Sequence, residues 1–505
     1  MPRHLFSALC LALCLTSISA TAQKRVLSYP FEFEKNFLAK GNYDCYFLEN
    51  TAESNFSLIL KDNKKIEYIL IDKNFKVISK FGAEIGNTVF DVKNLRDCTG
   101  GTAEKHQYHF IYPESKTEYQ MESVDFDTRS ATHQKLFEWT KDEHALVSFS
   151  DNNVFYALAT NDKTRSLGIS MVNASGQLQQ KSIPFPIPAT VSKDRNKLSE
   201  YLKGLKVIKS SEFPDLSTAV KSAKLFTSSD KLTIVINDGD NPAHLVSISL
   251  PDLTLTDQKI EYSNLIGKDE KGKVYISSFL TNNRLFSLVL NKKTIRIGIN
   301  DAPTGTLLGL LEINDNQALD LFADGPTAET RMGKRESGKP IEDVRKLIKA
   351  LTNGTEGLLV TENNKGQYIV TVGTYDLIPM STGTSGGSWT GGWDHNPSYN
   401  PSNPASTVNV WNPYMFYRPG FPSYTLKDAR YYRTTFFKVL LDPATFKIAH
   451  GRVPAAASDQ IKDYMETISK KNNATNQFAI GKTQYYGYYD RDALSYVVEQ
   501  IRLIQ

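Results

Sequence analysis

The chain has 505 residues, and its 59 lysines and arginines nearly balance 55 aspartates and glutamates, giving a formal net charge of +4 at pH 7. The basic residues are scattered along the sequence, which excludes the clustered basic face that a nucleic-acid-binding protein needs. A chain of this length builds either one large core or two to three ordinary domains.

Residues 1–22 are typical of a signal peptide, because an apolar run is followed by Ala20-Thr21-Ala22, the small-x-small pattern of a signal peptidase site. The run is shorter than the roughly 20 residues of a membrane span. Cys10 and Cys14 raise lipoprotein processing as an alternative, but a leucine precedes each of them where a small residue is required. We therefore expect an exported protein that begins near Gln23 and is periplasmic, cell-surface or secreted. No later stretch predicts a transmembrane segment in the mature chain.

The mature chain keeps two cysteines, Cys45 and Cys98. Export permits a disulfide, and neither the spacing nor the neighbouring residues suggest a metal or redox pair. A Cys45–Cys98 disulfide and two buried free thiols both remain open, because the sequence does not supply the distance between their Cα atoms.

A strand–turn–strand phrase recurs along the chain. ILIDKNFKVISK (69–80) has nearly the layout of VLLDPATFKIAHG (439–451), and four similar phrases lie between them. Asx, Pro and Gly residues initiate tight turns, and the flanks are rich in Val, Ile, Leu and Phe. The phrase is expected to be the outer hairpin of a repeated antiparallel unit, with all the turns on one rim. Its turn residues are Asp72, Asp127, Asn173, Asp252, Asn291 and Asp442.

The spacing of these turns predicts an all-β fold with helical insertions. Gaps of 55, 46 and 39 residues are close to the ~40–50 residues of a four-stranded propeller blade. The two larger gaps contain insertions at 192–208, 340–351 and 381–424, of which the first two have helical periodicity. We expect a β-propeller-like ring of about six four-stranded blades over 23–453, with seven as the alternative count. Stacked β-sandwiches are the alternative.

Residues 454–505 are expected to form a C-terminal helical or closing segment. SDQIKDYMETISKK (458–471) predicts a helix, and 492–504 fits either a helix or a last strand. Pairing of this end with SYPFEFEKNFL near the N-terminus would close the ring and remove exposed strand edges.

The leader and the repeated phrase together resemble the exported β-propeller-like proteins of Bacteroidetes. This resemblance implies export and a ring of antiparallel sheets, and it supplies no site residue.

The familiar chemical motifs are incomplete in this sequence. GKRESGKP (333–340) lacks the Ser or Thr of a phosphate-binding loop, and INDGDN (236–241) lacks the further ligands of a calcium loop and favours a tight turn. His106 and His109 would point to opposite faces of a strand. The sequence predicts no catalytic residue, no metal site and no cofactor.

Residues 382–424 stand out by composition, since aromatic side chains alternate there with Gly, Ser, Asn and Pro. Tryptophan and tyrosine are enriched in contacts with ligands and partners. The alternatives are that the insert packs on a blade or is disordered. The candidate ligand-binding residues are Trp389, Trp393, Trp411, Tyr399, Tyr414 and Tyr417.

These observations predict an exported, non-catalytic binding or interaction protein, with a glycan or a protein as its ligand. A propeller-type glycan hydrolase or lyase whose acids the sequence does not locate is one alternative. A structural component of the envelope is another.

Overall fold

We describe a computed structural model of the chain. The structure describes residues 24–33, 44–62, 64–84, 98, 100–188, 197–209, 213–239, 241–267, 273–322, 324–332, 335–363, 365–378, 431–449, 451, 453, 457–469, 473–480 and 483–503.

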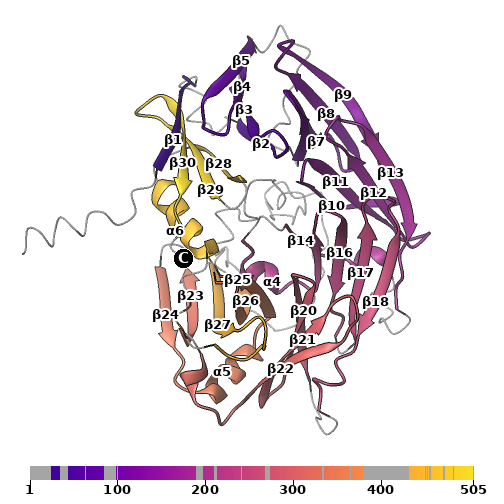
Figure 1. Ribbon diagram of the computed structural model, residues 1–505, viewed down its shortest axis with the longest axis vertical. Helices are drawn as coiled ribbons and strands as arrows, with labels where there is room; N and C mark the ends of the chain where they lie inside the picture. The colour runs from indigo at the N-terminus through magenta and orange to yellow at the C-terminus, as the bar shows by residue number, and fades with distance from the viewer. Residues whose placement is uncertain are drawn as a thin grey trace, which may run out of the picture.

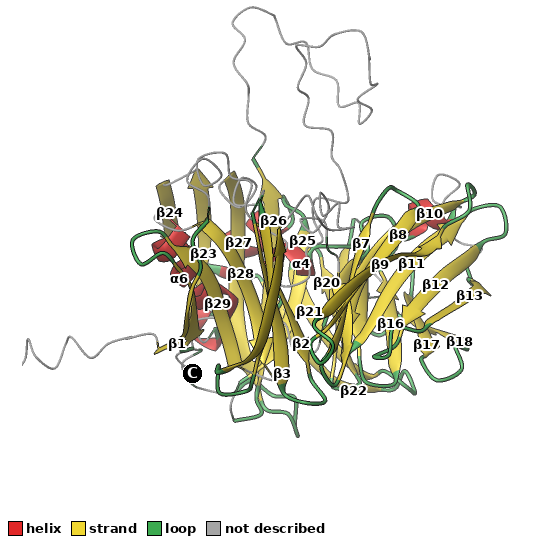
Figure 2. Ribbon diagram, turned by 90° about the horizontal axis from the view of Figure 1, so that it is seen from above, coloured by secondary structure: helices red, strands yellow, loops and turns green. Residues whose placement is uncertain are grey.

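Strands β1 to β30 form seven sheets that stand around a common axis as a ring (Figure 1). Seen from the side, the strands run from one rim of the ring to the other (Figure 2). The prediction of a propeller-like ring is confirmed and stacked sandwiches are excluded. The number of blades is seven, and two of them have five strands.

The first three blades are four-stranded meanders. Blade 1 contains β2 (Asp44–Asn50), β3 (Asn55–Lys61), β4 (Lys65–Ile71) and β5 (Val77–Glu84). Blade 2 contains β6 (Gly100–Glu104), β7 (Gln107–Pro113), β8 (Glu118–Asp125) and β9 (Ser130–Glu138). Blade 3 contains β10 (Glu143–Asp151), β11 (Val154–Asn161), β12 (Ser166–Val172) and β13 (Leu178–Pro184).

Blades 4 and 5 follow in chain order. Blade 4 contains β14 (Lys206–Ile208), β15 (Ala223–Thr227), β16 (Lys231–Ile236), β17 (Ala243–Ser249) and β18 (Leu255–Ile260), with β14 parallel to β15. Blade 5 contains β19 (Tyr275–Thr281), β20 (Arg284–Leu290), β21 (Thr294–Asp301) and β22 (Leu307–Asn314).

Blades 6 and 7 depart from a simple meander. From the inside outward, blade 6 has the order β25 (Glu356–Glu362), β26 (Tyr368–Leu377), β27 (Tyr431–Leu441), β23 (Asp324–Met332) and β24 (Arg335–Pro340). Blade 7 has β28 (Asn473–Ile480), β29 (Thr483–Asp490), β30 (Ser495–Ile501) and, outermost, β1 (Lys24–Pro30). Ser28 pairs with Val497, so the N-terminal strand closes the ring on the C-terminal blade.

The core lies between the faces of neighbouring blades. In β3, Phe56, Leu58 and Leu60 pack toward blade 7, while Ile59 packs toward blade 2. Successive side chains of a strand point to opposite faces, so a strand buried on both faces needs an apolar run rather than an alternating one. This explains sequences such as FSLIL in β3.

Asx residues shape the hairpin turns that the sequence predicted. The Asp72 carboxylate accepts from the backbone N–H groups of Asn74 and Lys76, each at 2.8 Å, between β4 and β5. Asn173 does the same between β12 and β13. Asp127 lies in the β8–β9 turn, but Asp125 accepts the bonds that stabilise it.

The expectation that all six turns share one rim is wrong at Asn291. Its side chain accepts from the N–H groups of Lys293 and Thr294, so the local chemistry is as predicted. The turn joins β20 to β21, the second and third strands of blade 5, and therefore lies on the opposite rim from turns between third and fourth strands. At Asp442 the turn leads only to a single bridge, Leu441–Ile448, because β23 takes the fourth position of blade 6.

The first predicted helix is shorter than expected. α3 (Leu198–Tyr201) has one turn, and Gly204 at φ +72° leads the chain into β14. The predicted apolar stripe is nevertheless buried: Leu198, Tyr201, Leu202 and Leu205 are all at most 8% exposed.

The other two predicted helices are present. α5 (Val344–Leu351) begins after Asp343, whose carboxylate accepts from the Lys346 backbone N–H. α6 (Ala457–Ser469) covers a face of blade 7 through Ile461. Residues 495–501 form a strand, so the helical alternative for the C-terminus is not adopted.

β14 and α4 (Leu216–Ala219) both lie on the inner side of the ring (Figure 1). β14 is the innermost strand of blade 4, whereas α4 packs on β25 and β26 of blade 6. Gly357 and Gly373 pair across β25 and β26 and leave room for the helix. A Cβ on Gly357 would lie 2.8 Å from Val220 Cγ1, and one on Gly373 would lie 2.7 Å from Leu216 Cδ2.

Of the two alternatives left open for Cys45 and Cys98, the structure has two thiols with no disulfide between them. Cys45 belongs to the cluster between blades 7 and 1, and Cys98 to the cluster between blades 1 and 2. The inner strand β2 separates the two clusters, because Cys45 and its neighbour Tyr46 point to opposite faces. Burial raises the pKa of the Cys98 thiol to about 12.

Candidate functional site

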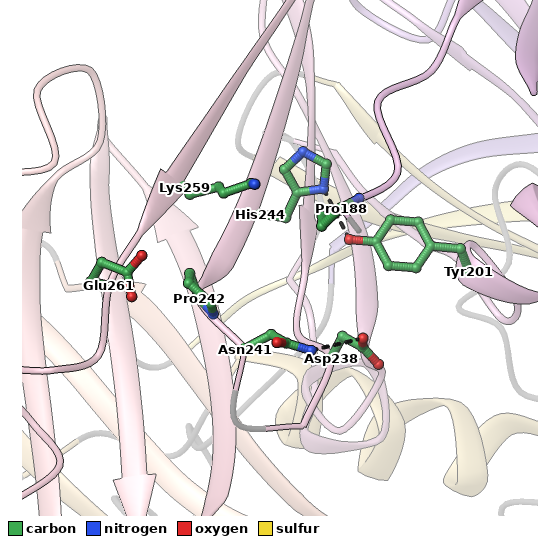
Figure 3. Close-up of a pocket in the computed structure, with 8 residues that line it drawn as sticks. All are labelled: Pro188, Tyr201, Asp238, Asn241, Pro242, His244, Lys259 and Glu261. Carbon is green, nitrogen blue, oxygen red and sulfur yellow. Dashed lines mark hydrogen bonds between the residues drawn. The ribbon is translucent and has the colours of Figure 1, made fainter. Parts of the chain in front are cut away.

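A small pocket lies on blade 4, at the rim where second strands turn into third strands (Figure 3). The β16–β17 turn supplies Asp238, Asn241 and Pro242. The linker from blade 3 supplies Pro188 and Tyr201 of α3. The start of β17 supplies His244, and the end of β18 supplies Lys259 and Glu261. The cavity volume is about 260 Å³.

A buried histidine forms one wall of the pocket. His244 is 2% exposed, and its Nδ1 lies 2.9 Å from the Tyr201 hydroxyl. Its Nε2 lies 3.6 Å from Asp257 Oδ2, beyond hydrogen-bond length. The negative charge of Asp257 favours the His244 tautomer that carries its proton on Nε2. Nδ1 of His244 then accepts a hydrogen bond from the Tyr201 hydroxyl. Burial lowers the pKa of His244 despite Asp257, which keeps the imidazole neutral near pH 7.

The opposite part of the pocket is polar and more open. Asn241 Nδ2 donates to Asp238 Oδ2 at 3.1 Å, which fixes both side chains in the β16–β17 turn (Figure 3). Lys259 and Glu261 are exposed and come from the outer strand of the blade. The lining therefore combines two carboxylates, an amide, an ammonium group and a neutral imidazole. Such a set both donates to and accepts from hydroxyl groups of a small polar ligand.

A lysine is buried where blades 4, 5 and 6 meet. Lys224 of β15 has no exposed surface, and its Nζ donates to Ser278 O at 3.0 Å and lies 3.5 Å from Ser277 Oγ. Ser277 Oγ also donates to Ala219 O at 3.4 Å and accepts from the Leu358 N–H at 3.2 Å. These contacts join α4 to blades 4, 5 and 6. Burial lowers the pKa of Lys224 to about 7 although Glu356 opposes the shift.

A buried acid lies between blades 1 and 2. Glu122 has no exposed surface and accepts from the Tyr68 hydroxyl, while its Oε2 has no hydrogen-bond partner among the described residues. Burial raises the pKa of this carboxyl to about 7. Its position inside the blade interface gives it a structural role.

The predicted ligand-binding residues fall outside the described part of the chain. Trp389, Trp393, Trp411, Tyr399, Tyr414 and Tyr417 all lie between 379 and 430. The strands on either side of this insert are described. Leu377 of β26 pairs with Tyr432 of β27, so the insert joins the second and third strands of blade 6. It therefore leaves and rejoins blade 6 at the rim that carries the pocket. The remaining tryptophan, Trp139, is 4% exposed and packs between blades 2 and 3.

Sequence reasoning missed most of the pocket. INDGDN was predicted to be a tight turn, and the described part of it forms the β16–β17 turn, but Asp238 also lines the cavity. Tyr201 and His244 are 43 residues apart and meet only when the linker folds onto blade 4. A histidine in an apolar strand was the only local signal.

His106 and His109 do not form a pair, since they bond separately to Asp127 and Ser123.

Two further searches returned nothing within the described residues. No group of three or more His, Cys, Asp and Glu side chains there is arranged to hold a metal ion. In the same part of the chain, none of the helices has both the length and the apolarity to cross a membrane.

Comparisons with known proteins return propeller structures of low similarity. No protein-family model matches the sequence, and no curated protein matches it either. Among solved structures, the β-propeller domain of the Trilobed protease from Pyrococcus furiosus is 8% identical, with 92% of this chain and 95% of that chain covered and a TM-score of 0.30. The Dos1 propeller is 8% identical over 95% and 88%, with a TM-score of 0.31. Prolyl oligopeptidase B from Galerina marginata is 9% identical over 68% and 48%, with a TM-score of 0.26. The fold assignment rests on the seven sheets described above, and these likenesses carry no functional argument.

Proposed function

We propose that this chain is an exported, non-catalytic binding protein whose ligand is a glycan. The observation that carries the proposal is the pocket on blade 4, with carboxylate, amide and ammonium groups around a neutral His244. Hydroxyl groups of a sugar are both donors and acceptors, and this lining offers both kinds of partner. A volume of about 260 Å³ lies below the range for drug-sized ligands and suits one sugar unit.

The shared rim supports a role for the aromatic insert. The insert joins β26 to β27, and the pocket includes the β16–β17 turn, so both belong to connections between second and third strands. Trp389, Trp393 and Trp411 would supply flat apolar faces for further sugar rings. Inserted loops on a rigid frame are the usual place for recognition. Export is supported by the leader and by the resemblance to exported propeller-like proteins of Bacteroidetes.

A glycan hydrolase or lyase is the second candidate, because Asp238 and Glu261 line the same pocket. Two arguments disfavour it. Asp238 is held by Asn241, and the Tyr201–His244 pair is buried, at 1% and 2% exposure, with the Tyr201 hydroxyl engaged by the imidazole. Groups that transfer protons to a substrate must reach it.

A glycan array followed by calorimetry with the best hits tests the proposal on the mature chain. Glu261→Gln and Asp238→Asn should each weaken binding by about 1.5–3 kcal/mol, the usual loss of a hydrogen bond to a charged group. Glu342→Gln is the matched control, because Glu342 is an exposed carboxylate just before α5 that does not line the pocket. Binding to no glycan, or equal losses in all three variants, would refute the pocket assignment. Release of reducing ends or of unsaturated sugars would establish the enzymatic alternative.

The tryptophans of the insert are tested separately. If they contact ligand, Trp→Ala at 389, 393 or 411 should weaken binding by roughly 2 kcal/mol or more with little change in stability. If they pack on a blade instead, the same changes should lower the free energy of unfolding by about 3–5 kcal/mol. Denaturant titrations beside the calorimetry separate the two results.

A further inference from the structure

The outer edges of the seven blades differ in charge. Six of the outermost strands carry lysine, a common protection of an edge against pairing with another chain. The exception is β22 of blade 5, whose first five residues, Leu307 to Leu311, carry no charge. Its one charged residue, Glu312, bonds to Arg296 Nε at 2.7 Å. The lysines of the other edges are Lys24, Lys80, Lys135, Lys181, Lys259 and Lys339.

β22 is covered at Gly309 and exposes two leucines. Gly309 faces Phe446 of the turn after β27, where a Cβ would lie 2.8 Å from Phe446 Cβ. Leu308 and Leu310 are 40% and 47% exposed, and of the large hydrophobic side chains exposed in the described residues they are the two that lie on one strand. Leu308 is the extra residue of a β-bulge, because Leu307 and Gly309 pair with the consecutive β21 residues Asn300 and Ile299. β22 lies at the outside of the ring and pairs with β21 on its inner side (Figure 1).

The sequence of this edge is symmetric about its centre. Leu307-Leu308-Gly309-Leu310-Leu311 is the same in both directions. Two copies of one strand that pair antiparallel about a two-fold axis must place each residue opposite its mirror position. With the axis at Gly309, Leu308 of one copy faces Leu310 of the other, and Leu307 faces Leu311. Thr306 then lies opposite Glu312, so no like charges meet.

We propose that the protein forms a two-fold dimer by antiparallel pairing of β22 with β22 of a second copy, centred on Gly309. The pairing joins two blades into one continuous sheet and satisfies the outward backbone groups of both edges. Leu308 and Leu310 of both copies then meet in one apolar cluster. A single strand from each copy makes a small interface, so the dimer dissociates on dilution, on the order of micromolar concentration.

Sedimentation velocity on the mature chain, from about 1 to 100 µM, tests the proposal. The wild type should shift from monomer to dimer, and Leu310→Lys should remain monomeric, since it brings like charges together at the symmetric contact. Ile78→Lys is the matched control, because Ile78 is a 51% exposed apolar residue on β5, the outer strand of blade 1. It should dimerise as the wild type does. Thermal melts confirm that each variant is folded.

A cross-linking experiment tests the register without depending on a disruptive change. Leu308→Cys and Leu310→Cys proteins are mixed and oxidised mildly, with the wild type as the control for its two native thiols. The mixture should give several-fold more disulfide-linked dimer than either variant alone. A wild type that stays monomeric throughout, a dimer that survives Leu310→Lys, or equal cross-linking in all samples would each overturn the proposal.

Discussion

Replacing the buried amine with Lys224→Met should change the pH dependence of stability. The folded pKa of Lys224 is lowered from 10.5 to about 7 by burial, so between those values the unfolded chain holds a proton that the folded chain has released. Unfolding then takes up one proton, and the free energy of unfolding rises with pH by ~1.4 kcal/mol per unit. Over the whole window the change is roughly 4–5 kcal/mol. Below about pH 7 the amine is protonated in both states, so the free energy of unfolding stays at its lower value and no longer changes with pH through this group.

The methionine variant lacks that dependence and lacks the hydrogen bonds to Ser277 and Ser278, whose loss costs about 1–3 kcal/mol. It should therefore be more stable than the wild type by about 1–4 kcal/mol at pH 7 and lose this advantage by pH 10. Urea titrations at half-unit pH intervals measure the difference, and exposed Lys292→Met is the control. A difference that does not change with pH, or a variant less stable than the wild type at pH 7, would show that Lys224 is not buried under α4 as described.

Three other predictions follow from particular contacts. In the wild type, the free energy of unfolding should fall by roughly 3 kcal/mol as pH rises from 4.5 to about 7, because folded Glu122 keeps a proton that the unfolded chain loses. Glu122→Gln should remove this pH dependence, and urea titrations between pH 4 and 8 measure it. Gly357→Ala should lower the free energy of unfolding by about 1–3 kcal/mol because the new Cβ displaces α4, whereas Gly325→Ala, with nothing within 4 Å, should leave it nearly unchanged. Equal stabilities of the two variants in denaturant would contradict the packing of α4 against Gly357. Mass spectrometry of the exported protein should find an N-terminus near Gln23, and a lipid-modified cysteine or a retained leader would exclude that cleavage.

Local chemistry made the turns predictable. An Asx side chain accepts from N–H groups two to four residues ahead, so Asp72, Asn173 and Asp442 identify their turns without tertiary information. The rim on which a turn lies depends on how many strands precede it in its blade. Asn291 follows the second strand of its blade rather than the third, and the residues around the turn give no indication of that position. The spacing of turns therefore predicted the ring but assigned Asn291 to the wrong rim.

Long-range packing made the pocket and the burial of Lys224 unpredictable. Tyr201 belongs to a predicted helix and His244 to an ordinary strand, and only the return of the linker onto blade 4 joins them. Lys224 lies in AKLFT, where a lysine suggests a solvated edge. It is buried because β14 pairs beside it and because blade 5 and α4 meet around its amine, contacts that no repeat spacing encodes. The helix predicted over 192–208 ended early for the same reason, since part of it became β14.

Closing a ring of blades explains where both proposed surfaces lie. Pairing β1 with β30 joins the N-terminal strand to the C-terminal blade, but every blade still ends in an outer strand whose outer edge pairs with no further strand. Lysine lies on six of those edges, so the lysine-free edge of β22, whose residues 307–311 read the same in both directions, is the one suited to a second copy of the chain. β14 and α4 pack on the inner sides of blades 4 and 6, and the proposed recognition surface lies on the rim, where β16–β17 and β26–β27 connect second to third strands. A dimer through β22 would leave that rim of each copy open, since the strand edge and the rim are different surfaces of the ring.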